Sequence, residues 1–122
     1  MKVLLAEDNP ISMAVVKRLL SKWGIDIVPA TNGREAVEKF EPGKYDILLL
    51  DLEMPELDGA SALKEIRKFD QQVPIVAFTA AVYENMQNDL REKGFNDFLN
   101  KPFSPEDLYS IIFTQSAAKG RA

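Results

Sequence analysis

The hydrophobic residues of this chain form two alternating kinds of run, short unbroken runs and longer runs with helical spacing. The short runs predict buried strands, and the spaced runs predict amphipathic helices. The most hydrophobic stretch, residues 47–50, contains no polar position, as expected of an interior strand that is covered on both faces. It ends on Asp51 and leads into a loop through Pro55, Asp58 and Gly59.

Five strands alternate with five helices in this pattern. The strands are predicted at residues 2–6, 25–30, 47–50, 73–78 and 95–100. The helices are predicted after an Asn9–Pro10 cap, around residues 36–40, at residues 60–69 and 83–93, and from a capping box at Ser104, Pro105 and Asp107. This alternation predicts a parallel sheet with helices on both faces. Pro29 lacks an amide donor and therefore places the second strand at an edge. With right-handed crossovers, the expected architecture is the flavodoxin-like, doubly wound order 2-1-3-4-5.

The amino-acid composition excludes several classes of function. The 122 residues suffice for about one domain, which we expect at residues 1–115, with residues 116–122 as a tail or linker. The chain has no Cys and no His, so a reducing compartment is expected, and carboxylates, hydroxyls and amines must carry the chemistry. No run is long enough to cross a membrane, and a cytoplasmic location is expected. The net charge of −4 argues against direct binding of nucleic acid.

Four of the predicted strands end beside polar side chains. Glu7 and Asp8 follow the first strand, Asp51 ends the third, Thr79 ends the fourth, and Lys101 follows the fifth. The carboxyl ends of parallel strands meet at one edge of the sheet, where ligands bind. Carboxylates within about 4–6 Å of each other repel unless cations enter the cluster, and Lys101 and Mg²⁺ are suitable cations. Asp51 is then a candidate nucleophile toward a phosphoryl group.

Taken together, these motifs resemble the receiver domain of two-component response regulators, the CheY-like family. The motifs are Glu7 and Asp8, the DLEMP segment with the Asp58–Gly59 pair, Thr79–Ala80, and the KPF segment at residues 101–103. The resemblance covers residue 2 to about residue 113, and residues 6–24 look most like receivers attached to hybrid histidine kinases. It implies that Asp51 accepts a phosphoryl group from a histidine kinase or a histidine phosphotransfer protein.

The resemblance also implies a metal site. Asp8 and Asp51 would bind Mg²⁺ directly, the backbone carbonyl of Glu53 would complete the protein ligands, and Glu7 would act through water. On this interpretation, the chain is a signalling domain that assists its own phosphorylation and dephosphorylation, and it is not an enzyme in its own right.

A switch is implied as well. Thr79 and Lys101 would hold the phosphoryl oxygens, and Phe98 matches the aromatic switch position but lacks a hydroxyl group. The Lys101–Pro102 bond would be cis. Phosphorylation would then change the face formed by the fourth helix, fifth strand and fifth helix, to which a downstream protein would bind.

Three other interpretations remain open at this point. A receiver-like module that binds proteins but is never phosphorylated would have the same fold. A phosphatase with an Asp nucleophile could use Asp51 together with Glu53, although such enzymes prefer Asp at the second position. A flavin-binding protein has a similar strand order, but a flavin phosphate prefers amides and hydroxyls to three carboxylates.

Overall fold

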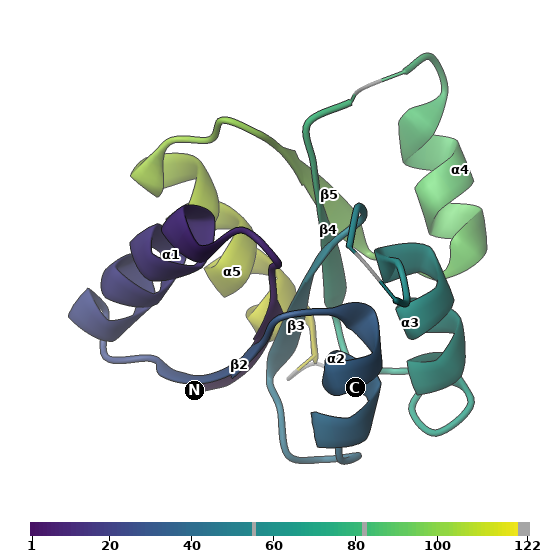
Figure 1. Ribbon diagram of the computed structural model, residues 1–122, viewed down its shortest axis with the longest axis horizontal. Helices are drawn as coiled ribbons and strands as arrows, with labels where there is room; N and C mark the ends of the chain where they lie inside the picture. Colours follow the sequence, from purple (N-terminus) through teal and green to yellow (C-terminus); the bar gives the residue numbers. More distant parts are fainter. Residues whose placement is uncertain (55, 82, 120–122) are drawn as a thin grey trace.

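Five parallel strands form one sheet in the order β2-β1-β3-β4-β5, with helices on both faces (Figure 1). The computed structural model describes residues 1–54, 56–81 and 83–119, so Pro55, Val82 and residues 120–122 lie outside the described part. The strands are β1 (Lys2–Ala6), β2 (Asp26–Ala30), β3 (Ile47–Asp51), β4 (Ile75–Thr79) and β5 (Asp97–Asn100). The helices are α1 (Pro10–Lys22), α2 (Gly33–Lys39), α3 (Gly59–Arg67), α4 (Met86–Lys93) and α5 (Pro105–Lys119). The predicted fold class and strand order are confirmed.

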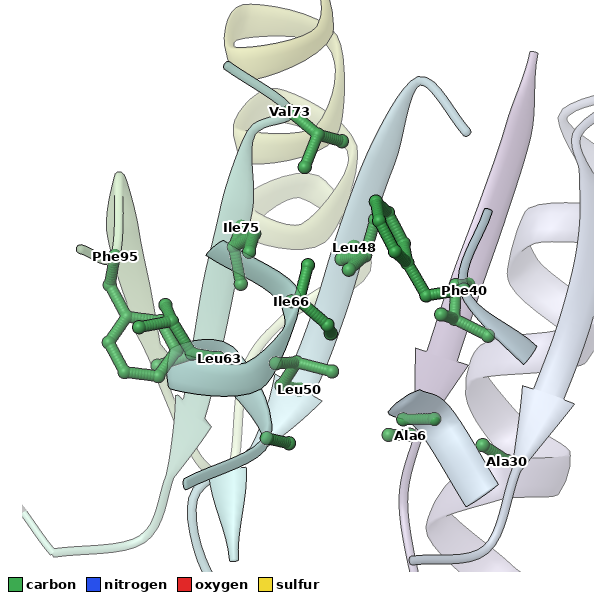
Figure 2. Packing of buried hydrophobic residues seen from close by; sticks show 14 of the residues in the cluster. Ala6, Ala30, Phe40, Leu48, Leu50, Leu63, Ile66, Val73, Ile75 and Phe95 are labelled. Carbon is green, nitrogen blue, oxygen red and sulfur yellow. The ribbon is translucent and has the colours of Figure 1, made fainter. Parts of the chain in front are cut away.

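The core consists of two layers, one on each face of the sheet. Every residue of β3 is buried, and successive side chains of a strand point to opposite faces. Figure 2 shows one layer, in which Leu63 and Ile66 of α3 pack with Leu48, Leu50 and Ile75 of the sheet. On the other face, α1 and α5 pack with the alternate residues of the strands. The buried members of that layer are Val3, Leu5, Val16, Leu20, Ile25, Ile47, Leu49, Val76, Phe78, Leu108 and Ile112.

Side-chain caps fix the starts of the two helices that follow β1 and β5. The Asn9 side chain accepts two amides of the first turn of α1, at 2.9 and 3.1 Å, and Pro10 occupies the first helical position. The Ser104 hydroxyl accepts the amide of Asp107 at 3.1 Å at the start of α5. Both predicted helix starts are confirmed. Because the caps hold the ends of the loops, they also hold the residues between each strand and its helix.

The predicted start of the fourth helix is wrong. The helix α4 begins at Met86, three residues later than expected, because Asn85 adopts a left-handed conformation with φ of 63°. Tyr83 falls within the predicted range but lies outside the helix; it is 49% exposed, and its hydroxyl donates to the carboxylate of Asp89. The polar contact outside the helix is available to Tyr83 because the chain turns before the helix starts.

The predicted boundary at residue 115 is not a structural break. The helix α5 continues through Lys119, so residues 116–119, expected to form a tail, are helical. The Gln115 amide group donates to the Asp97 carboxylate at 3.3 Å and holds this part of the helix against β5. Residues such as Ala117 favour helix, so the hydrogen-bond ladder can continue past that contact. No helix in the described part of the chain combines the length and hydrophobicity that a membrane span requires.

Candidate functional site

Three acids meet where β1 and β3 end. These two strands are neighbours, with Ala6 opposite Leu50, so the residues that follow them leave the sheet side by side. Glu7, Asp8 and Asp51 each offer a carboxylate oxygen, and these oxygens lie within 4.8 Å of one another. Glu7 is 1% exposed and Asp51 is 5% exposed, whereas Asp8 faces solvent. The predicted acidic cluster is therefore present and has one open side.

A single ammonium group binds two of these acids. Lys101, in the loop between β5 and α5, places Nζ 2.6 Å from Oε2 of Glu7 and 2.9 Å from Oδ2 of Asp51. Three carboxylates and one ammonium leave two negative charges when all are ionised. Like charges at such distances repel by about 1–4 kcal/mol per pair near a protein surface. The cluster is therefore suited to accept a further cation.

Burial and the lysine act in opposite directions on Glu7. Burial raises the pKa of Glu7 above its ordinary value of 4.5, and the hydrogen bond from Lys101 partly offsets that rise. Burial by itself would lower the pKa of Lys101, but its hydrogen bonds to Glu7 and Asp51 outweigh burial and raise the pKa above 10.5. Lys101 therefore stays charged at neutral pH and supplies a permanent positive charge to the cluster.

Both carboxylate oxygens of Asp51 have partners. Oδ2 accepts from Lys101, and Oδ1 accepts the backbone amide of Glu53 at 3.0 Å. A pocket of about 300 Å³ opens over this carboxylate. Its lining comprises Glu7, Asp8, Asn9, Ser12, Asp51, Glu53, Ala80 and Lys101. The two hydrogen bonds hold the Asp51 carboxylate in one orientation, and the pocket leaves an approach to it from solvent.

Thr79 lies at the end of β4, and its hydroxyl bonds within its own loop. Its hydroxyl donates to the carbonyl of Ala81 at 3.0 Å and accepts the amide of Ala81 at 3.1 Å. The side chain is almost completely buried, at 2% exposure. Ala80 rather than Thr79 lines the acidic pocket. The hydroxyl predicted to hold a phosphoryl oxygen is thus next in sequence to a residue of the pocket wall, and it is hydrogen-bonded to the backbone of its own loop.

Phe98 borders a different pocket. The ring is half-buried and packs against the core layer beneath α3 and α4. With Tyr83, Asn85 and Met86, it lines a pocket of about 340 Å³ beside the start of α4. Phe98 pairs with Ala77 of β4, two residues before Thr79. The two predicted switch residues therefore lie on neighbouring strands, and the alternation of side chains along a strand places them on the same face of the sheet.

The loop that carries Lys101 is tied to β4. The amide of Lys101 donates to the carbonyl of Thr79 at 2.7 Å, and the bond between Lys101 and Pro102 is cis, as predicted. This connection positions the start of the Lys101 side chain at the same sheet edge as Asp51. The ammonium group can therefore reach both buried acids.

An apolar groove that the sequence patterns did not predict lies beside the acids. Ile11 and Val15 are 76% and 52% exposed on α1, and with Pro102 and Phe103 they line a groove of about 380 Å³. Glu7, Ser12, Ala80 and Lys101 line both this groove and the acidic pocket. The signal for it was the four-residue spacing of Ile11 and Val15, on a different face of the helix from the buried Val16 and Leu20.

Fold and site together define an α/β protein with the flavodoxin-like strand order and an acidic, lysine-containing pocket at the switch point of its sheet. The chain belongs to the response regulator receiver domain family, because the model of that family matches residues 3–113. Receiver domains are the signalling domains of two-component systems.

The proteins similar to this chain differ greatly in length. The chain is 38% identical over 112 residues to the chemotaxis protein CheY of Thermotoga maritima, covering 91% of this chain and 93% of CheY. It is 39% identical over 110 residues to the transcription factor SKN7 of Candida albicans, covering 90% of this chain and 20% of SKN7. It is 37% identical over 123 residues to hybrid signal transduction histidine kinase I of Dictyostelium discoideum, covering 93% of this chain and 7% of that kinase. The chain thus spans a fifth or less of these two longer relatives.

A solved receiver domain has the same fold as this chain. The receiver domain of a sensor histidine kinase from Pseudomonas aeruginosa PAO1 superimposes with a TM-score of 0.83 at 36% identity, covering 95% of this chain and 97% of that chain. That structure is described with a magnesium ion coordinated in the active site cleft. The predicted membership of the CheY-like receiver family, with hybrid kinase receivers among its relatives, is confirmed.

Proposed function

We propose that this chain is the phosphoacceptor receiver of a two-component phosphorelay, in which Asp51 accepts a phosphoryl group from a phosphohistidine. The donor would be a histidine kinase or a histidine phosphotransfer protein. One observation carries the proposal: the nearly buried Asp51 carboxylate is held between the Lys101 ammonium at 2.9 Å and the Glu53 amide at 3.0 Å. An anionic nucleophile that is oriented in this way, beneath a pocket open to solvent, suits phosphoryl transfer.

The transfer forms one bond and breaks one. An oxygen of Asp51 bonds to phosphorus while the bond between phosphorus and the donor's imidazole nitrogen breaks, and its electron pair remains with the imidazole. Lys101 neutralises part of the charge that the phosphoryl oxygens bring into the pocket. The Glu53 amide holds one oxygen of Asp51, so the carboxylate does not have to be reoriented during the reaction.

The acidic cluster has the composition of a magnesium site. Its donor atoms are carboxylate oxygens within 4.8 Å of one another, and the single ammonium does not balance their charge. Mg²⁺ prefers oxygen ligands, uses one or two carboxylates and retains several waters, which suits the exposed side at Asp8. We assign Asp8, Asp51 and the Glu53 carbonyl as direct ligands and Glu7 as a ligand through water. When bound, the ion would neutralise phosphoryl oxygens and orient them toward Asp51.

The donor would rest on the apolar groove next to the pocket. Any protein that brings a histidine to Asp51 covers the walls of the acidic pocket, and four of these wall residues also border the groove. Ile11 and Val15 would then lose solvent contact on binding, which favours association. The proposed output is a switch: Thr79 leaves Ala81 to bind a phosphoryl oxygen, and Phe98 changes its packing. The face of α4, β5 and α5 would then bind a downstream protein differently.

The direct test is phosphorylation by a small donor. Acetyl phosphate with Mg²⁺ should add about 80 Da to the intact protein, and the gain should be absent in Asp51→Asn. Asp46→Asn is the control, because this acid lies at the opposite end of β3 and accepts the Lys2 amide at 2.8 Å. A wild-type mass that stays unchanged, or an equal gain in Asp51→Asn, would rule out Asp51 as the phosphoacceptor.

Magnesium should stabilise the unmodified protein. At a Mg²⁺ concentration one hundred times Kd, the stabilisation is about 2.7 kcal/mol, which corresponds to a rise in Tm of roughly 10 °C. Asp8→Asn removes a direct ligand and should reduce the rise strongly, while the exposed Asp26→Asn should leave it intact. Thermal unfolding with and without Mg²⁺ measures this. Equal rises in wild type and Asp8→Asn would contradict the assigned ligands.

A further inference from the structure

Arg67 is a half-buried charged residue that the proposed phosphotransfer does not use. It ends α3 at the amino-terminal edge of the sheet, away from the acidic pocket. Its guanidinium donates to the Val73 carbonyl at 2.7 Å, to the Gly94 carbonyl at 2.7 and 3.1 Å, and to the Asn96 side chain at 2.9 Å. A longer contact, at 3.3 Å, reaches the carbonyl of Asp70. One side chain thus joins α3 to the segments that precede β4 and β5.

These contacts fasten the C-terminal end of α4. Gly94 ends that helix in a left-handed conformation with φ of 114°, and its carbonyl accepts twice from Arg67. The amide of Phe95 returns to the carbonyl of Leu90 at 2.9 Å. The Asn96 side-chain oxygen accepts the amide of Ile75 at 2.8 Å as well as Arg67. A planar guanidinium that serves several acceptors at once holds them in a fixed relative geometry.

The N-terminal end of α4 is held much less firmly. Asn85 makes no capping hydrogen bond with its side chain, and its backbone has the left-handed conformation. The Met86 amide donates to the Tyr83 carbonyl at 3.2 Å, and the Tyr83 hydroxyl contact with Asp89 is exposed. Met86 is buried, but it borders the pocket of about 340 Å³ that Phe98 also lines, and an unbranched thioether repacks easily. This end therefore has space beside it, and the hydrogen bonds named here are local ones.

We propose that α4 is hinged at its C-terminal end, with Arg67 as the clamp, so that the helix moves at the end beside the Phe98 pocket. Figure 1 shows α4 next to α3, which carries the clamp. In the sequence, Thr79 precedes the N-terminal end of α4, which is the free end, whereas the clamped C-terminal end leads into β5. Only the last step rests on the proposed function: phosphorylation at Asp51 would be the input that moves the free end, and Arg67 would stop the movement from reaching the start of β5.

Hydrogen exchange of single amides tests the hinge in the unmodified protein. In the wild type, the amides of Gly94, Phe95 and Asn96 should exchange at least about tenfold more slowly, after correction for intrinsic rates, than those of Met86 and Asp89. Arg67→Met keeps an apolar stem but removes every donor. It should speed exchange at the three clamped amides by about tenfold or more and leave the other two unchanged.

Lys68→Met is the matched control, because it removes the same charge from the next residue, whose ammonium pairs with Glu65 at 3.1 Å in an exposed position. The amide of Leu48, which donates to Pro74 at 2.9 Å within the core, reports global unfolding in each variant. If Arg67→Met unfolds, two measurements still test the hinge. One is the comparison of exchange at the two ends of α4 in the wild type, and the other is exchange in Arg67→Lys, which keeps the charge but loses the planar fork. Equal exchange at the two ends of α4, or clamped amides unaffected by loss of the guanidinium, would overturn the hinge.

Beryllofluoride, which mimics a phosphoryl group, tests the last step. Its changes in exchange should be confined to Met86 and Asp89 in the wild type and should spread to Gly94 and Asn96 in Arg67→Met. Changes that already reach Gly94 and Asn96 in the wild type would overturn the confinement by Arg67. If beryllofluoride has no effect and acetyl phosphate adds no mass, the proposed function fails, while the comparison of unmodified proteins still decides the hinge.

Discussion

Lys101→Met should lower the free energy of unfolding by about 3 kcal/mol at neutral pH without Mg²⁺. Nζ of Lys101 lies 2.6 Å from Glu7 and 2.9 Å from Asp51, and these acids are 1% and 5% exposed. Methionine fills a similar volume but leaves two adjacent buried carboxylates without their cation. Removing one partner of a buried ion pair costs far more than the pair contributes, because the remaining charge stays desolvated.

The loss should grow as the pH rises. Burial already raises the pKa of Glu7 above 4.5, and the hydrogen bond from Lys101 lowers this pKa and so limits the rise. Without the lysine, folded Glu7 keeps its proton to higher pH, so between pH 4.5 and its new pKa the folded variant binds more protons than the unfolded chain. Stability then falls with rising pH in this window. At low pH Glu7 is neutral in both proteins, and the difference should shrink.

Urea unfolding at several pH values measures both effects. Lys68→Met, which loses an exposed ion pair, should change stability by no more than about 0.5 kcal/mol at any pH. Added Mg²⁺ should restore part of the stability of Lys101→Met, since it supplies the missing positive charge. A destabilisation that is the same at pH 5 and pH 8 would mean that the lysine contributes by packing and not by compensating Glu7.

Gly59→Ala should destabilise the protein by about 3 kcal/mol, although alanine is the better helix former by about 1 kcal/mol. Gly59 is the first residue of α3, and its backbone does not require glycine. A Cβ atom there would overlap the carbonyl oxygen of Asp51 and lie 2.9 Å from Cα of Leu52. Both are backbone atoms and cannot move aside without displacing the end of β3.

The effect should extend to the site, because the displaced backbone carries Asp51. We expect Gly59→Ala to bind Mg²⁺ more weakly, as measured by the rise in Tm, and to be phosphorylated more slowly by acetyl phosphate. Ser61→Ala lies in the same turn and should stay within about 0.5 kcal/mol of the wild type. If Gly59→Ala were as stable as the wild type, the close approach of α3 to β3 would not hold in solution.

Sequence patterns could predict the elements because each depends on local chemistry. The unbroken apolar run before Asp51 can be buried on both faces only as an interior strand, and Pro29 can tolerate only an edge. The start of α4 was different, since the left-handed turn at Asn85 has no strong sequence signal. Helical residues 116–119 were missed for a related reason: their support includes the contact of Gln115 with Asp97, which lies on another element.

The order of strands along the chain was enough to predict that Glu7, Asp8, Asp51 and Lys101 share one edge, because parallel strands all deliver their carboxyl ends to the same side of a sheet. Three contacts became known only from the fold: Lys101 binds Glu7 as well as Asp51, the Thr79 hydroxyl bonds to Ala81, and Arg67 reaches Gly94. Burial follows the periodic pattern of hydrophobic residues, so it can be predicted from the sequence. Contacts between distant residues depend on how closely two backbones approach, and shifts of about an ångström, which leave no trace in the sequence, make or break them.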